Sequence, residues 1–303
     1  MLKEYYEDNL DADSAKREVQ KLTFYPMMFQ AARVMRNTGM LELLYQNKKN
    51  GISAKEVANQ LNLPFYGVNT LLETSLTVGI AYLKEDGIYA ISRMGYFLLK
   101  DEATRVNLNF THDVCYKAMY HLEASIKNER PEGLKEIGLP DNETIYPSLS
   151  ELVEPIKASW FEFDHYYSDG AFPKALKIVF EDKPKHMIDI GGNTGKWSVQ
   201  CCLYDEDVQM TIVDLSSQLD QAKENIENLN LTGRIKGIVR DVLSDDLTFP
   251  EETDAVWMSQ FLDCFSEEQI VQILKNISNT INDNTPVYIL ELFWDRQKDL
   301  EAA

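Results

Sequence analysis

The sequence predicts an α/β protein, with a parallel, doubly wound sheet in its second half and a mainly helical first half. From about residue 172, short apolar runs alternate with helical segments, which is typical of a parallel sheet covered by helices on both faces. In the first half, three helical segments precede two short apolar runs that flank Glu85-Asp86-Gly87. Because Asp-Gly is a strong hairpin signal, these two runs predict a small antiparallel wing.

The first half therefore has the pattern of a winged helix-turn-helix. Apolar residues recur at helical spacing over residues 22–44. Ser53, followed by Glu56 three residues later, predicts a capping box at the start of the next helix. A third helix is expected over residues 66–78, and the polar residues 1–20 predict a helical arm or a frayed terminus.

Winged helices are common in DNA-binding proteins, but this chain lacks the side chains for that role. Between Phe65 and Ile80 there is no Lys or Arg, and the one charged side chain is Glu73. Base and phosphate contacts rely mainly on basic and amide side chains. The net charge of −19 also repels phosphate backbones and anionic membranes. We expect a packing and dimerisation module, with neither nucleic acid nor membrane as a partner.

Composition favours a cytoplasmic protein without a metal site. The four cysteines show no spacing typical of a disulfide framework or a zinc site, which favours reduced thiols. The four histidines form no i, i+4 pair, and no metal is expected. There is no run of 18 apolar residues, so no transmembrane helix is expected. Residues 1–8 are too acidic and polar for a secretory signal.

Five strands are expected in the second half, and polar residues follow them. The expected strands cover 187–190, 210–213, 235–239, 255–258 and 287–290. Ligands of such sheets bind beyond the carboxyl ends of the strands, where Gly191, Asp214, Asp241 and Glu291 are expected. Residues 92–170 are mainly helical and rich in aromatic residues, which form core or interface or cover a pocket.

The stretch 187–195 is the most informative motif. An apolar run containing Asp189 ends at Gly191-Gly192, and a helix is expected directly after Gly195. Glycines allow the backbone to approach a ligand closely, and the first amides of a helix point at whatever lies there. Asp214 lies about 20 residues further on, where an acid that binds ribose hydroxyls is expected. A nicotinamide-binding turn would need glycines where Asn193 and Lys196 stand, so that alternative is weaker.

Together these motifs resemble the S-adenosylmethionine-dependent O-methyltransferases of the caffeate and hydroxyindole type. The resemblance covers about residues 24–294 and is most specific at 188–195, 213–215, 240–242 and 260–267. It implies a Rossmann-like class I methyltransferase domain preceded by a mainly α winged-helix dimerisation domain. The implied divisions are 1–105 for the dimerisation domain, 106–172 for a helical linker or cap, and 173–303 for the cofactor-binding domain. Because the resembling family continues through two more strands, we expect this sequence to be a fragment or its sheet to end unusually.

The resemblance also implies the roles of individual residues. S-adenosylmethionine would bind at Asp189, Gly191, Gly192, Gly195, Asp214, Leu215, Asp241, Val242 and Ser259. Of these, Asp214 would hold the ribose and Asp241 the adenine. The acceptor pocket would include Phe161, Phe261 and Phe265. A cofactor without phosphate groups needs no lysine cradle, and carboxylates near its positive charges are favourable.

The chain departs from the family pattern where catalysis is concerned. Asn193 replaces a glycine of the turn, although asparagine tolerates left-handed backbone. Asp263 stands where the family has its catalytic histidine, and Ser259 replaces a lysine four residues earlier. Asp263 would act as base if burial raised its pKa, or it would only orient the acceptor. His165 is a second candidate base.

We therefore expect a homodimeric methyltransferase that acts on a hydroxyl of a small aromatic or polyketide-like acceptor. Two alternatives remain: methylation of carbon or nitrogen, and a regulator that binds the cofactor without catalysis.

Overall fold

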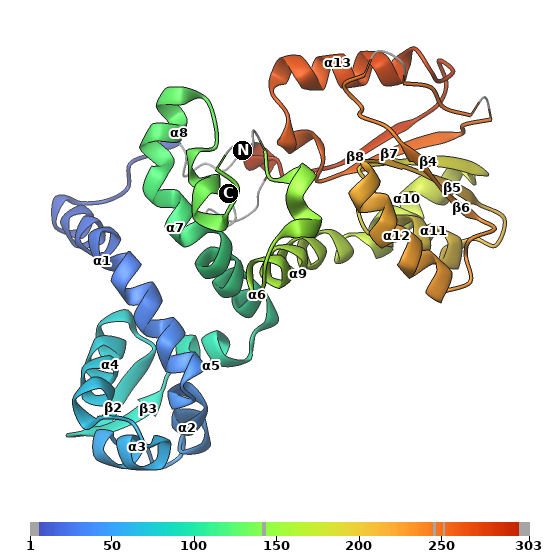
Figure 1. Ribbon diagram of the computed structural model, residues 1–303. Coiled ribbons are helices and arrows are strands. Elements are labelled where there is room, and N and C mark those ends of the chain that lie inside the picture. The colour runs from blue at the N-terminus through green and yellow to red at the C-terminus, as the bar shows by residue number, and fades with distance from the viewer. Residues whose placement is uncertain (1–5, 141–143, 245–246, 251, 297–303) are drawn as a thin grey trace. The chain divides into compact units, whose positions relative to one another are not determined.

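The computed structural model describes residues 6–140, 144–244, 247–250 and 252–296. The described chain divides into two compact units, one up to Tyr116 and the other from Lys117 onward (Figure 1). None of the described helices is long and apolar enough to cross a membrane.

The first unit is mainly helical. Its elements are, in order, α1 (Ala12–Asn37), α2 (Met40–Gln46), β1 (Ile52–Ser53), α3 (Ala54–Leu61), α4 (Phe65–Val78), β2 (Ala81–Glu85), β3 (Ile88–Ile91), α5 (Arg93–Lys100), α6 (Glu102–Phe110) and the π-helical turn η2 (Thr111–Cys115). The helix α1 begins earlier than its apolar pattern indicates, because Asp11 caps it by accepting a hydrogen bond from the backbone N–H of Ser14.

The predicted helices and wing of this unit are confirmed. Ser53 and Glu56 form the capping box at the start of α3. The strands β2 and β3 form the antiparallel hairpin around Gly87, and β1 adds a third strand that the sequence pattern did not predict. The buried core lies between these elements and includes Met35, Leu44 and Leu72.

The second unit begins with short helical elements and continues into the sheet. Its helical elements before the sheet are α7 (Tyr116–Ala118), η3 (Met119–His121), α8 (Leu122–Asn128), η4 (Glu132–Ile137), η5 (Tyr146–Glu151), α9 (Ile156–Asp169), α10 (Phe172–Val179) and η6 (Phe180–Asp182). The later elements are β4 (His186–Ile190), α11 (Lys196–Tyr204), β5 (Gln209–Asp214), α12 (Ser216–Asn228), β6 (Ile235–Val239), β7 (Ala255–Ser259), η7 (Leu262–Cys264), α13 (Glu267–Ser278), β8 (Val287–Leu290) and η8 (Trp294–Arg296).

The predicted parallel sheet is confirmed in the described part of the chain. Its order is β6-β5-β4-β7-β8, and every neighbouring pair is parallel. The chain proceeds outward from β4 through β5 to β6 and then returns to β7 on the other side of β4. The topological switch point of the sheet therefore lies at the carboxyl ends of β4 and β7, where α/β proteins of this type bind ligands.

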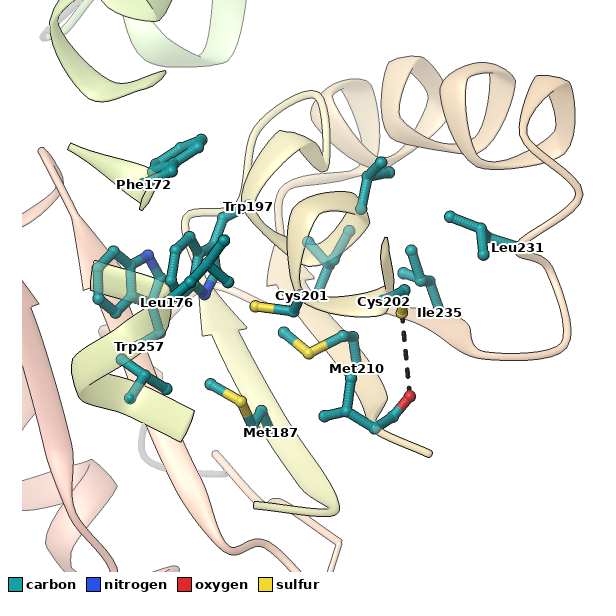
Figure 2. Packing of buried hydrophobic residues seen from close by; sticks show 14 of the residues in the cluster. Phe172, Leu176, Met187, Trp197, Cys201, Cys202, Met210, Leu231, Ile235 and Trp257 are labelled. Carbon is teal, nitrogen blue, oxygen red and sulfur yellow. Dashed lines mark hydrogen bonds between the residues drawn. The ribbon is translucent and has the colours of Figure 1, made fainter. Parts of the chain in front are cut away.

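Alternation along β4 separates two apolar layers. Met187 packs with α10, α11 and α12 on one face, whereas Ile188 and Ile190 pack with α13 on the other (Figure 1). Because both faces are covered, the strands are almost continuously apolar. In the first layer, Trp197 of α11 stacks on Trp257 of β7, with ring centroids 3.9 Å apart (Figure 2).

Candidate nucleoside-binding site

The turn between β4 and α11 is packed so tightly that its first two glycines have no space for a side chain. A Cβ atom on Gly191 would lie 2.2 Å from the ring of Phe261, and one on Gly192 would lie 2.8 Å from both Asp189 and Ile212. Gly191 and Gly195 also have φ values of +67° and +75°, which glycine adopts without strain. The glycines thus bring the backbone into close contact with its surroundings at the sheet edge.

Asp189 lies beneath this turn. Its carboxylate is 2% exposed and accepts a hydrogen bond of 2.7 Å from Ser198 Oγ of α11. Burial raises its pKa to about 7, and the hydrogen bond from Ser198 opposes that rise. Because the side chain is enclosed, it fixes the turn from below.

Asp214 connects the glycine turn to the end of β5. Its Oδ2 accepts from the backbone N–H of Asn193 at 2.8 Å, and its Oδ1 accepts from the backbone N–H of Leu215 at 2.7 Å. Burial raises the pKa of Asp214, while these two backbone donors hold it down. Each oxygen keeps a second lone pair, so the carboxylate can accept further hydrogen bonds from hydroxyl groups.

Asn193 adopts the left-handed conformation expected at its position. Its φ is +49°, which an asparagine tolerates better than most residues. Asn193 therefore continues the turn where the resembling family has glycine, and it adds an amide side chain at the edge of the sheet.

The predicted adenine-side residues lie after β6. Asp241 is exposed, and its Oδ1 accepts from the backbone N–H of Leu243 at 2.9 Å. Val242 is buried in the apolar layer beneath α13. Ser259, at the end of β7, has a buried Oγ with no hydrogen-bond partner among the described residues. Such an unpaired hydroxyl is costly unless a ligand or water satisfies it.

The segment after β7 carries the candidate catalytic residue. The backbone N–H groups of Phe261 and Leu262 donate to Glu291 Oε1 at 2.8 and 2.9 Å, which fixes this segment to the end of β8. Asp263 accepts a hydrogen bond of 3.4 Å from Cys264 Sγ. Burial raises the pKa of the Cys264 thiol to about 12, so this thiol stays protonated and acts as a donor.

The predicted pocket aromatics form two groups. Phe261 and Phe265 pack edge to face, with centroids 5.1 Å apart, and Phe261 lies against Gly191. Phe161 of α9 stacks on His165 one turn later, with centroids 6.1 Å apart. Burial lowers the pKa of His165 to about 4, so this imidazole is neutral at neutral pH.

Helix α9 also contributes charged residues that the sequence analysis did not identify. Asp164 Oδ2 accepts from Asn193 Nδ2 at 3.1 Å, and Asp169 Oδ2 pairs with Lys196 Nζ at 2.7 Å. These contacts join α9 to the glycine turn and the start of α11. The sequence carried no signal for them, because the paired residues lie 29 and 27 positions apart.

The described residues fit a nucleoside rather than a nucleotide. The glycine cradle has no room for side chains. An acidic residue also follows each of the two strands beside β4: Asp214 ends β5, and Asp263 lies in η7, after β7. Of the charged groups named here, Lys196 is the single cation, and it is already paired with Asp169. The fold and this edge therefore define the class of Rossmann-like domains that can bind a nucleoside.

Comparison with known proteins agrees with this class. Residues 172–302 match the model of the O-methyltransferase domain, and residues 16–88 match the Dimerisation2-like domain. The chain therefore carries a Dimerisation2-like domain followed by an O-methyltransferase domain.

Curated relatives are similar over part of their length. The chain is 31% identical over 114 residues to 3-hydroxy-5-methyl-1-naphthoate 3-O-methyltransferase of Streptomyces sahachiroi, a match that covers 38% of this chain and 32% of the relative. It is 26% identical over 125 residues to bacteriochlorophyllide d C-20 methyltransferase of Chlorobaculum tepidum, covering 40% of this chain and 36% of the relative. The matched stretch thus spans about a third of each relative.

The fold extends further than this sequence similarity. The apo crystal structure of the S-adenosylmethionine-dependent methyltransferase SibL is similar with a TM-score of 0.69 at 20% identity. The match covers 94% of this chain and 83% of SibL. At this identity the likeness supports the fold of the chain.

Proposed function

We propose that this protein transfers a methyl group from S-adenosylmethionine to a hydroxyl of a small aromatic or polyketide-like acceptor. The observation that carries the proposal is the position of Asp214, which both braces the glycine turn through the Asn193 N–H and retains lone pairs for ribose hydroxyls. The matched O-methyltransferase domain and the naphthoate 3-O-methyltransferase support the reaction and the acceptor class.

The cofactor would be held by groups that are already in place. Gly191, Gly192 and Gly195 form the turn after β4 and carry no side chain, and Leu215 and Asp241 follow the two strands on that side. The buried, unpaired Oγ of Ser259 would gain a hydrogen-bond partner. When bound, S-adenosylmethionine supplies a methyl group that its sulfonium already activates for displacement.

Asp263 would hold the acceptor hydroxyl at the other side of the switch point. Its carboxylate accepts from the Cys264 thiol and keeps capacity for another donor, so an acceptor O–H can donate to it. Holding an oxygen in line with an activated methyl carbon lowers the barrier by fixing geometry, and accepting the hydroxyl proton completes the reaction. His165 is neutral and can accept a proton as well, but Phe161 stacks on its ring.

The first unit would mediate homodimerisation. It contains the matched Dimerisation2-like domain, and α1 exposes the apolar side chains of Leu22, Phe24, Tyr25 and Met27. Exposed apolar patches of this kind mark interaction surfaces. A second copy is the occupant that the domain match favours. We also place the protein in the cytoplasm, which the free cysteines at 115, 201, 202 and 264 support.

Calorimetry and a methylation screen test the proposal. S-adenosylmethionine should bind more tightly than NAD, and tighter binding of NAD would overturn the cofactor assignment. Phenols and hydroxynaphthoates should then be screened with labelled cofactor, and the product's NMR spectrum should show the methyl group on oxygen. A methyl group on carbon would instead place the protein with its C-20 methyltransferase relative. Cofactor binding without turnover on any acceptor would favour the regulator.

A further inference from the structure

Asn193 presents an acceptor atom that the described protein does not use. Its Nδ2 donates to Asp164, but its Oδ1 is buried and has no hydrogen-bond partner among the described residues. Thr194, the next residue of the turn, is 8% exposed, and its Oγ1 is likewise unpaired. Buried polar atoms without partners are rare in folded proteins, because each forfeits its hydrogen bonds with water. Two of them in one ligand-facing turn point to a missing polar group.

Asp164 supplies a negative charge at the same place. Its Oδ2 lies 3.1 Å from Asn193 Nδ2, and its side chain remains 31% exposed. The fixed charges around it are mixed: Asp169 and Asp263 disfavour its ionised form, Lys196 favours it, and His165 lies 4.0 Å from Oδ2 and is neutral. A cation bound here would therefore relieve a carboxylate that has no direct ion pair among the described residues other than the contact with neutral His165.

The turn adds a further constraint on the ligand. Lys196 begins α11 directly after Gly195, and the first N–H groups of a helix attract negative charge. The acceptor oxygens of Asp164 and Asn193, together with a positively polarised helix start three residues after Asn193, match a zwitterion. The α-amino acid group of the cofactor's methionine portion has this chemistry: an ammonium with three donors and a carboxylate.

We propose that Asp164 and the side-chain carbonyl of Asn193 bind the α-ammonium of the cofactor's methionine portion. This inference rests on the proposed function. The two residues thereby anchor the amino-acid end of the cofactor, while Asp214 holds its ribose. The interaction is specific to this chain's turn, because a glycine at position 193 would offer no side-chain acceptor.

The test compares three ligands by calorimetry with the full chain. S-adenosylhomocysteine carries both the ammonium and the carboxylate, its decarboxylated form carries the ammonium alone, and 5′-methylthioadenosine carries neither. Asp164→Asn should lower the affinity for the first two ligands by about tenfold, which corresponds to the loss of one charge-assisted hydrogen bond. The affinity for 5′-methylthioadenosine should not change. Asn193→Gly should lower the affinity for the same two ligands by a few-fold, since glycine adopts the left-handed backbone but has no side-chain hydrogen-bond acceptor.

Glu224→Gln, which removes an exposed carboxylate on α12, is the matched control and should change none of the three affinities. If Asp164→Asn weakened all three ligands equally, Asp164 would only support α9 and the inference would be wrong. If it weakened none, the ammonium would bind elsewhere. Failure of all three ligands to bind the unmodified chain would overturn the proposed function itself, and a fall of thermal midpoint without a change in ligand preference would also count against the inference.

Discussion

The two sides of the switch point differ in how fully their acidic residues are held. After β4 and β5, Asp189 and Asp214 each have strong donors: Ser198 Oγ for the first, two backbone N–H groups for the second. After β7, Asp263 has a thiol donor at 3.4 Å, and Ser259 has no partner among the described residues. The first side is preorganised without a ligand, whereas the second depends on groups that the cofactor and the acceptor would bring.

This contrast suggests that cofactor binding and acceptor chemistry can be disrupted separately. Hydrogen bonds from backbone N–H groups set the geometry of the first side whatever the acceptor is. The second side departs from the resembling family at Asp263, which the acceptor hydroxyl would contact, so this position can match a particular acceptor. Substitutions on the first side should change affinity, and those on the second should change turnover.

The largest effect should come from Gly191→Ala, because this substitution perturbs both the glycine turn after β4 and Phe261 after β7. The new Cβ would overlap the ring of Phe261 at 2.2 Å, and the left-handed φ of +67° adds strain. We expect a loss of about 3 kcal/mol in the free energy of unfolding, together with loss of detectable cofactor binding. Urea denaturation and calorimetry measure both. Gly233→Ala is the control, because nothing lies within 4 Å of its Cβ; similar losses in both variants would contradict the steric explanation.

Asp214→Ala should lower the affinity for S-adenosylhomocysteine by about 100-fold. It removes both the expected contacts to the ribose and the acceptor for the backbone N–H of Asn193. Asp241→Ala, at an exposed position with one backbone contact, should cost about tenfold or less. Calorimetry at one pH compares the two variants. Equal losses would mean that the brace at the turn contributes nothing.

Asp263→Asn should lower turnover by about 100-fold and leave the affinity for S-adenosylhomocysteine unchanged, because an amide can orient an acceptor hydroxyl but is a far weaker base. Rates with saturating cofactor provide the measurement. His165→Gln is the comparison: a loss of similar size in that variant alone would transfer the catalytic role to α9.

The smallest effect concerns the pH dependence of stability and depends on Asp189 and Asp164, whose pKa values burial raises. The pKa values of Asp189 and Asp164 are raised to about 7 and about 6, so the folded state binds more protons than the unfolded state between about pH 4 and pH 7. The ligand-free protein should therefore lose stability as pH rises through this window, by a few degrees in thermal midpoint. Asp189→Asn should flatten the profile, and an unchanged slope would show that Asp189 stays ionised.

The sheet and its turn were predictable because their signals are local. Buried parallel strands are continuous apolar runs, and all five lie within a residue or two of their expected positions. Local signals are weaker at helix starts: α12 begins at Ser216 with three polar residues before its first apolar residue, Leu219. Contacts such as Asp164 with Asn193 depend on how α9 packs, which no short motif encodes.

The stacked indoles of Trp197 and Trp257 should contribute a distinct signal to the near-ultraviolet circular dichroism of the protein. One ring belongs to the helix that starts at the glycine turn, and the other belongs to the strand that leads to Asp263, yet their planes differ by only 15° (Figure 2). Aromatic rings this close couple electronically, so the near-ultraviolet circular dichroism depends on their distance and relative orientation. A ligand that shifts α11 against β7 by a fraction of an ångström should therefore change the near-ultraviolet spectrum, and no added label is needed to detect it.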